Sequence, residues 1–280
     1  MGIKTIFKWY YRYVAIRQPK VNSWVPHDSP QIHQQLIKQL KQADFNLVHF
    51  KIKPSDYKRY IDQADYHQFP DYYNNGQAPD FIEKTLEHFL TAKLLQLNKK
   101  DIYIDIANAG SPVPEIYHQL YGCKTYRQDL AFPKGIDNNV IGGNAADMPL
   151  KNNFADKMAL HCSFEHFEGN ADINFIKEAN RVLKKNGRLC ILPLYLFNQY
   201  AIQTDPVVLF KNNIAFETDA TLYCAKDYHN RHGRFYDIPH LISRIKNNLN
   251  QLKLTIYIIQ NIKTINSTAH LKFAALLEKS

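Results

Sequence analysis

Cysteine is scarce in this chain of 280 residues, and its four copies lie far apart. Cys123, Cys162, Cys190 and Cys224 form no Cys-x-x-Cys pair. Structural zinc sites and disulfide frameworks need closely patterned cysteines, so the sequence predicts neither and indicates a reducing, cytoplasmic location. Cys162 and Cys190 stand in apolar runs, where we expect them to pack as small core residues.

Long apolar runs are also missing. No stretch of the chain reaches the roughly 20 apolar residues that a transmembrane helix needs. Lys8 and Arg12 interrupt what would be the apolar region of a secretory signal. Gly2 follows the initiator Met, but Ile6 stands where a myristoylation signal has Ser or Thr. We therefore predict neither a transmembrane segment nor one of these targeting signals.

The first residues nevertheless have an amphipathic pattern. Over residues 3–17, Ile3, Phe7, Tyr10 and Val14 share one helical face, while basic residues gather on another. Such a helix can lie on an anionic membrane surface or pack against its own domain, and both interpretations stay open here. Residues 18–30 contain three prolines and are interpreted as a linker.

Internal repeats and low-complexity tracts are absent, and no block of basic residues stands out. Hydrophobic residues make up 45% of the chain, which is enough for a sizeable core. The formal net charge of +9 favours anionic partners, although its even spread makes nucleic acid the second expectation. We divide the chain into an N-terminal extension over residues 1–78 and a main domain over 79–280, with an insertion at 197–240.

Strands and helices alternate through the middle of the chain. Strand patterns occupy 102–106, 123–129, 139–141, 155–162 and 189–196, and helix patterns occupy 79–97, 115–121 and 172–185. This alternation predicts a parallel sheet with right-handed crossovers. A helix over 241–249 precedes two apolar runs, 252–259 and 271–277, which should form an antiparallel hairpin. Nearer the N-terminus, we expect a helix over 31–42 and a strand over 45–52.

The ends of the predicted strands carry the informative residues. Four small residues follow Asp105, and they would let backbone N–H groups approach a ligand: Ala107, Asn108, Ala109 and Gly110. Asp129 ends the next strand, where a carboxylate can accept hydrogen bonds from both hydroxyls of a ribose. Two further stretches are GGNAADMPLKNNFADKM at 142–158 and EANRVLKKNGRLCIL at 178–192.

In this order and spacing, the four stretches resemble those of class I S-adenosylmethionine-dependent methyltransferases. The resemblance covers residues 80–196 well and the tail more loosely. It implies an α/β fold with a Rossmann-like, mostly parallel, seven-stranded sheet that ends in an antiparallel hairpin. It also implies S-adenosyl-L-methionine as cofactor, bound by Asp105, Ala107, Asn108, Ala109, Gly110, Asp129, Leu130, Asn144, Ala145 and His161.

The chain departs from the family pattern at Ala107 and Ala109, where the family usually has glycine. Alanine disfavours a positive φ and adds a methyl group at the cofactor surface. No G-x-G-x-x-G fingerprint follows the first strand, which disfavours a nicotinamide cofactor. A methyltransferase-like protein that binds a partner or nucleoside without catalysis is therefore one alternative function.

Methyl transfer to an oxygen needs a group that removes a proton, and histidines follow the fourth main strand. The stretch LHCSFEHFEG at 160–169 contains His161, Glu165 and His166. His166 is the first candidate base, with the alternative that it caps or packs the following helix. His161 ends an apolar strand, where a hydrogen-bonded core histidine is the expected interpretation.

A second polar cluster lies in the insertion, in YHNRHGRFYD at 228–237. Its arginines could grip a carboxylate or phosphate and its aromatic rings could cover a sugar, or its charges could pair among themselves at the surface. We assign His232 to catalysis and assign Tyr195, Asp205, Arg231, Arg234 and Tyr236 to substrate binding. A metal site of His232, Asp237 and Asp205 lacks ligand spacing, so none is predicted.

The sequence thus predicts a cytoplasmic methyltransferase whose N-terminal segments and insertion close over the acceptor. The Tyr-, Asp- and His-rich residues 54–73 can line a polar, aromatic pocket, or form an irregular surface segment. On that basis we expect O-methylation of a small polar or glycan-type acceptor. An RNA methyltransferase is the alternative enzyme that the net charge suggests.

Overall fold

The structure is a computed structural model, and it describes residues 2, 6, 21–205 and 216–280. The amphipathic pattern of residues 3–17 and part of the insertion lie outside the described residues. Contacts divide the chain into two compact units. The first unit contains the described parts of Met1–Asp44, Phe164–Ile173 and Tyr195–Asn247, and the second contains Phe45–Ser163, Asn174–Leu194 and Asn248–Ser280.

The second unit is built on one sheet whose strands run in the order β1-β11-β12-β7-β6-β2-β3-β5-β4. Pairing is parallel from β5 through β3, β2 and β6 to β7, and antiparallel where β12 joins β7 and β11. The strands are β1 (Asn46–Phe50), β2 (Ile102–Ile106), β3 (Lys124–Asp129), β4 (Gly135–Asp137), β5 (Val140–Gly142), β6 (Ala155–His161), β7 (Leu183–Leu192), β11 (Leu252–Ile259) and β12 (Phe273–Lys279).

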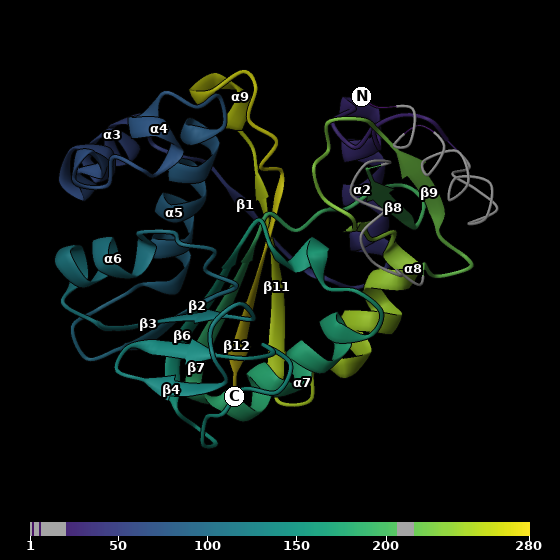
Figure 1. Cartoon of the computed structure of the whole chain (residues 1–280). Helices are drawn as coiled ribbons and strands as arrows, with labels where there is room; N and C mark the ends of the chain where they lie inside the picture. Colours follow the sequence, from purple (N-terminus) through teal and green to yellow (C-terminus); the bar gives the residue numbers. More distant parts are fainter. Residues whose placement is uncertain (1, 3–5, 7–20, 206–215) are drawn as a thin grey trace. The chain divides into compact units, whose positions relative to one another are not determined.

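Apolar side chains on both faces make the centre of this sheet its core. Tyr103, Ile104 and Ile106 in β2 are at most 1% exposed, and Met158 and Leu160 in β6 are fully buried. This is the pattern expected of parallel strands that are covered on both sides. Helices α5 (Phe81–Leu95) and α6 (Val113–Tyr121) pack against the central strands, and Figure 1 draws them on the same side of the sheet.

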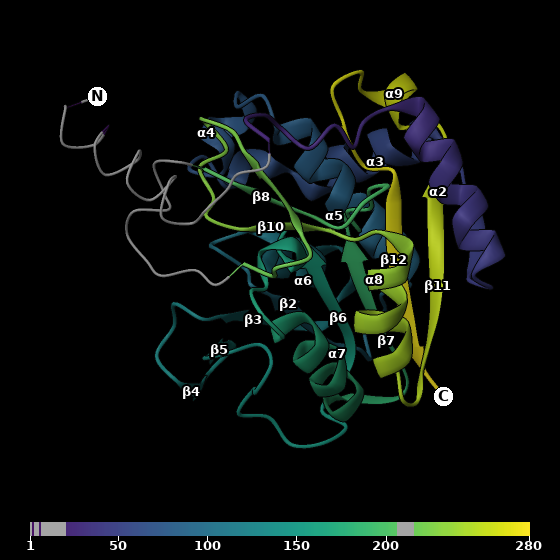
Figure 2. The same cartoon turned by 90° about the vertical axis from the view of Figure 1, so that its right-hand side faces the viewer.

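The predicted parallel sheet and final antiparallel hairpin are confirmed, but the sheet has nine strands among the described residues rather than seven. β1 pairs with β11 along one edge, and β4 pairs with β5 at the opposite edge. Figure 2 shows β11 and β4 toward opposite ends of the sheet. Residues 45–78 lie in the second unit, where β1 is part of the sheet.

The region rich in Tyr, Asp and His is helical, not irregular. It contains α3 (Pro54–Ala64), η1 (Tyr66–Gln68) and α4 (Tyr73–Gly76). Tyr60 and Tyr66 are buried, and their hydroxyls lie 3.1 Å apart. Tyr57 and Tyr60 of α3 both contact the ring of Phe89 in α5, so these two rings pack between the helices.

The helix predicted over 172–185 ends earlier, and the strand after it begins earlier. α7 (Ala171–Val182) leads directly into β7, whose Leu183 pairs with Ala155 of β6. Lys184 lies in β7 and its Nζ contacts Asp156 Oδ2 at 2.7 Å. The pairing of β7 with β6 is a tertiary contact that overrides the local helical pattern of the two successive lysines.

The first unit contains a small sheet whose strands run in the order β10-β8-β9. Its strands are β8 (Ala201–Thr204), β9 (Thr221–Cys224) and β10 (Gly233–Phe235). Its helical segments are α2 (Pro30–Gln42), η2 (Phe164–His166), α8 (Ile238–His240), η4 (Leu241–Ile245) and η5 (Lys246–Asn248). In the second unit, α9 (Ile262–Ile265) lies in the polar connection between β11 and β12.

Asp172 is the buried anion around which the first unit packs. It accepts hydrogen bonds from Tyr236 Oη at 2.6 Å and Arg244 Nη2 at 2.7 Å, and Arg234 Nη1 lies 3.0 Å away. Burial alone would raise the pKa of Asp172, but hydrogen bonds from Arg244 and the charge of Arg234 lower it below its usual value. The carboxylate therefore stays charged and holds two arginines in place.

Candidate functional site

The loop after β2 has the backbone conformation that glycine usually supplies. Ala107, Ala109 and Gly110 have φ values of 52°, 48° and 80°. The left-handed region costs an alanine about 1 kcal/mol or more, so this shape is held by surrounding contacts rather than by local preference. The predicted tight turn of small residues is present despite the two alanines.

Gln128 and Asp129, at the end of β3, hold this loop. Gln128 Oε1 accepts a hydrogen bond from the N–H of Ala107 at 3.2 Å, and Gln128 Nε2 donates to the carbonyl of Gly143 at 2.6 Å. Asp129 Oδ2 accepts from the N–H of Ala109 at 2.9 Å. One strand end therefore fixes both the loop after β2 and the loop after β5.

An apolar side chain is exposed directly beside this carboxylate. Leu130 is 75% exposed, so its apolar side chain is accessible to a ligand. Asp129 Oδ1 accepts from the N–H of Ala131 at 2.9 Å, and each carboxylate oxygen retains a further lone pair. The arrangement combines acceptors for hydroxyl groups with an apolar surface for a flat ring.

The loop after β5 lies next to the same strand end. Asn144 is exposed, and its Oδ1 accepts from the N–H of Ala146 at 2.9 Å. Ala145 is 7% exposed. Gly142 permits the close approach of this loop, because a Cβ atom there would lie 1.8 Å from the carbonyl oxygen of Pro133. Asn144 therefore presents an amide at the surface beside a closely packed turn.

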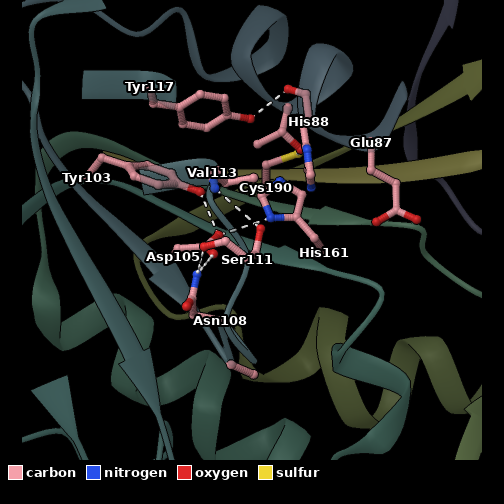
Figure 3. Close-up of polar contacts among 12 residues, drawn as sticks. Glu87, His88, Tyr103, Asp105, Asn108, Ser111, Val113, Tyr117, His161 and Cys190 are labelled. Carbon is pink, nitrogen blue, oxygen red and sulfur yellow. Dashed lines mark hydrogen bonds and ion pairs between the residues drawn. The ribbon is translucent and has the colours of Figure 1, made fainter. Parts of the chain in front are cut away.

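Asp105 and His161 meet at the ends of the two neighbouring strands β2 and β6. His161 Nδ1 lies 3.0 Å from Asp105 Oδ1. Asp105 also accepts hydrogen bonds from Tyr103 Oη at 2.8 Å and from Asn108 Nδ2 at 2.7 Å. Figure 3 shows these groups around the carboxylate, with His88 of α5 above the His161 ring.

The candidates for acid–base chemistry after β6 lie in the first unit. His166 Nδ1 is 2.6 Å from the carbonyl oxygen of His232, and His166 Nε2 is 3.7 Å from Glu165 Oε1. His232 Nδ1 is 3.1 Å from the carbonyl oxygen of Glu165. Burial, with the charge of Arg234, lowers the pKa of His232 to about 3, so this imidazole is neutral at physiological pH.

Two residues assigned to substrate binding from the sequence are instead committed to the packing of the first unit. Arg234 is 0% exposed and donates to Tyr200 Oη at 3.0 Å and to the carbonyls of Phe167 and Gly169 at 2.6 and 2.9 Å, and it also contacts Glu217. Tyr236 is 1% exposed and donates to Asp172. Their ionic and polar character reflects a buried network, which sequence spacing does not distinguish from a ligand site.

The other substrate-binding candidates lie in the first unit too, and each has a contact with one neighbouring residue. Arg231 forms a two-bond contact with Glu168, at 2.5 and 2.7 Å. Asp205 is buried and its Oδ2 accepts from the N–H of His229 at 3.0 Å. Tyr195 is partly buried and packs against Phe235 with ring centroids 5.1 Å apart. Their substrate role stays a prediction.

Sequence reasoning missed two polar residues of the second unit. Gln128 is 1% exposed between the two loops, and His88 is 1% exposed in α5. The sequence did offer one signal for Gln128, because it is a polar residue directly before Asp129 at the end of a strand. His88 gave no signal, because its position beside His161 depends on helix packing across 72 intervening positions.

These side chains fit an S-adenosyl nucleoside. Asp129 offers carboxylate oxygens for ribose hydroxyls, exposed Leu130 offers an apolar face for adenine, and Asn144 offers an amide edge. The loop stays accessible to a ligand despite the Cβ atoms of Ala107 and Ala109, because Ala109 and Gly110 are exposed. Within the described ranges, no group of three or more His, Cys, Asp or Glu residues could hold a metal ion.

The fold and this site define a cofactor-binding α/β protein with the strand order β5-β3-β2-β6-β7-β12-β11 within the larger sheet. Residues 110–191 match the family model described as methyltransferase domain. This match confirms the methyltransferase domain that the resemblance of the four stretches to class I S-adenosylmethionine-dependent methyltransferases predicted. No curated protein matches the chain.

Several solved structures are similar to the chain at low identity. The 1,6-didemethyltoxoflavin-N1-methyltransferase of Burkholderia thailandensis is 13% identical, with 82% of this chain and 91% of that chain covered and a TM-score of 0.47. Geranyl diphosphate C-methyltransferase of Streptomyces coelicolor A3(2) is 12% identical, with 91% and 98% covered and a TM-score of 0.47. The PH0226 protein of Pyrococcus horikoshii OT3 is 13% identical, with 77% and 98% covered and a TM-score of 0.49.

No helix among the described residues combines the length and the apolar character that a bilayer span requires.

Proposed function

We propose that this protein transfers a methyl group from S-adenosyl-L-methionine to a hydroxyl group of a small polar or glycan-type acceptor. The observation that carries the proposal is the pairing of Asp129 with exposed Leu130 beside the strained loop at 107–110. A carboxylate and an apolar surface in adjacent positions suit the ribose and adenine of one nucleoside.

A polar acceptor is favoured by the side chains next to that loop in the second unit. Burial raises the pKa of Tyr72, and Ser111, directly after the loop, acts on the same hydroxyl in the opposite direction. Lys84 and Glu87 of α5 form an ion pair of 3.0 Å, although the Glu87 side chain is only 1% exposed. Burial raises the pKa of Tyr73, and the charges of Lys84 and Glu87 act on the same hydroxyl. Charged and hydroxyl groups of this density suit a hydroxylated acceptor better than a hydrocarbon.

When bound, S-adenosylmethionine supplies an electrophilic methyl group on a sulfonium. The chain then has to bind the nucleoside, align the acceptor and receive its proton. Asp129 and Leu130 take the first task, with Asn144 and Ala145 at the adenine edge and residues 107–110 beside the remainder of the cofactor.

Two histidines are candidates for the proton acceptor. His166 directs Nδ1 to a carbonyl oxygen, which leaves Nε2 for a proton, with Glu165 3.7 Å away. His161 lies in the unit that holds the proposed cofactor residues. Its Nδ1 is likewise bonded to an oxygen, that of Asp105, which leaves its Nε2 for a proton. Arg231, Asp205 and Tyr195 remain proposed contacts for the acceptor.

Calorimetric titration with S-adenosylhomocysteine tests the cofactor assignment, and we expect a micromolar Kd. Absence of binding at millimolar cofactor would reject the proposal. Incubation of the protein with S-adenosyl-[methyl-³H]methionine and cell extract then tests the acceptor. Label in a small-molecule or glycan fraction is the expected result.

The net charge of +9 favours RNA as the second candidate acceptor. In the same experiment, label that is released as methylated nucleosides after nuclease digestion would replace the small-acceptor proposal with RNA methylation. An RNA gel shift that weakens as salt is increased would support the same replacement.

A further inference from the structure

His161 has one ring nitrogen that the described residues leave without a partner. Its side chain is 7% exposed, and Nδ1 is bonded to Asp105 Oδ1 at 3.0 Å. Its Nε2 is buried and has no hydrogen-bond partner among the described residues. A buried polar atom without a partner is costly, so such atoms are usually retained for a ligand, a water molecule or a reaction. His161 is therefore not the fully bonded core histidine that its apolar strand suggested.

Asp105 fixes both the orientation and the tautomer of this ring. The carboxylate is 1% exposed, and donors from Tyr103 and Asn108 hold its two oxygens in place. Because a carboxylate is an acceptor only, the shared hydrogen belongs on His161 Nδ1. The neutral imidazole then carries its lone pair on Nε2, as in other carboxylate–histidine pairs that accept protons.

The groups around the ring do not compete for that lone pair. His88 of α5 packs edge-on against His161, with ring centroids 5.0 Å apart and an angle of 81°. His88 is bonded to Tyr66 Oη at 2.7 Å, and burial lowers its pKa well below the usual value, so it stays neutral. The nearby charged residues of α5, Lys84 and Glu87, are paired with each other. Figure 3 shows Asp105 and His88 on adjacent sides of the His161 ring.

We propose that His161, positioned by Asp105, is the catalytic residue that accepts the acceptor's hydroxyl proton. This inference rests on the proposed methyl transfer to oxygen. The acceptor oxygen forms a bond to the methyl carbon, and the carbon–sulfur bond breaks with its electron pair left on sulfur. The hydroxyl proton goes to His161 Nε2, and Asp105 stabilises the resulting imidazolium. The proton then passes to solvent.

The first test reads the tautomer of His161 without any acceptor. The protein, with ¹⁵N-labelled histidine and saturated with S-adenosylhomocysteine, is studied by two-dimensional NMR at pH 8, with His161→Gln used to assign the signal. We expect Nδ1 to be protonated and Nε2 to be unprotonated. In Asp105→Asn we expect this single tautomer to be replaced by a mixture. A wild-type ring protonated on Nε2 alone would overturn the proposal.

The second test separates a proton-accepting role from a cofactor-binding role. In His161→Gln we expect the Kd for S-adenosylhomocysteine to change less than about threefold, while methyl transfer into extract falls about 100-fold or more. His49→Gln, which changes an exposed histidine of the same unit, is the matched control and should retain the wild-type rate. Loss of cofactor binding in His161→Gln, parallel to the loss of transfer, would overturn the proposal.

A comparison with His166 completes the test. If His166→Gln loses methyl transfer 100-fold while His161→Gln retains it, His166 is the base and our assignment is wrong. If the wild-type protein binds S-adenosylhomocysteine but labels nothing, the proposed transfer to an acceptor fails. The NMR measurement then still decides whether Asp105 holds His161 with an unprotonated Nε2.

Discussion

Asp129 Oδ2 accepts a hydrogen bond from the main-chain N–H of Ala109 at 2.9 Å. This bond joins the end of β3 to the loop after β2, and it gives one carboxylate two roles. It supports a loop whose alanines are in the left-handed region, and it stands where a ribose is expected to bind.

Asp129→Ala is therefore expected to raise the Kd for S-adenosylhomocysteine about 10- to 100-fold, because hydrogen bonds to a charged group are lost. Calorimetric titration measures the change. Asp137→Ala, which removes an exposed carboxylate from β4, is the matched control and should bind normally. Equal affinity for wild-type and Asp129→Ala proteins would show that the ribose assignment is wrong.

Ala109→Gly should raise the free energy of unfolding by up to about 1 kcal/mol, because glycine adopts a φ of 48° without steric cost. Urea unfolding measures the difference through the midpoint. Ala131→Gly is the control, since Ala131 is exposed and its φ is not positive; no gain is expected there. A lower midpoint for Ala109→Gly would indicate that the alanine methyl group makes a stabilising contact.

Asp172→Asn should destabilise the protein by about 3 kcal/mol, because it removes the buried charge that Arg234 and Arg244 share. Thermal and urea unfolding measure this loss. Asp219→Asn changes a carboxylate that is 63% exposed and pairs with His240, so its effect should stay within about 0.5 kcal/mol. Similar effects for the two variants would contradict the central role of Asp172.

The depressed pKa of His232 predicts a loss of stability in mild acid. Burial lowers this pKa from 6.5 to about 3 in the folded chain. As pH falls below 6.5, the unfolded chain takes up a proton that the folded chain does not. The stabilisation is complete above pH 6.5 and is lost progressively toward pH 3, at up to about 1.4 kcal/mol per pH unit.

Unfolding in urea at pH 7, 6 and 5 measures this slope, and His232→Gln should reduce it by about one proton. His67→Gln, with an exposed ring, should leave the slope unchanged. A slope that is the same in His232→Gln and in the wild-type protein would show that His232 is protonated in the folded state.

Local pattern predicted the elements that lie near the centre of the sheet. Strand period and turn composition are local properties of the sequence. They therefore predicted the apolar run before Asp105, the small residues after it and the acid that ends β3. For the same reason the predicted hairpin of residues 252–277 matches the pairing of β11 with β12.

Features that depend on contacts between distant segments had no local signal. Lys184 lies in β7, which pairs with β6 and brings its Nζ to Asp156, and β1 pairs with β11 from about 200 positions away. Arg234 and Tyr236 resembled ligand-binding residues in the sequence, but Asp172 draws both into a buried network. Chemistry alone does not reveal whether a polar side chain faces a ligand or another side chain.

The sequence by itself determined the class of fold and the order of the cofactor-binding stretches, because hydrophobic period, turn residues and strand-end acids act over a few positions. Only the tertiary structure decided how the alanine loop is held, since Gln128 and Asp129 reach it from the next strand. Only the tertiary structure brought Asp105 beside His161, because the two residues lie on adjacent parallel strands whose carboxyl ends meet at one edge of the sheet.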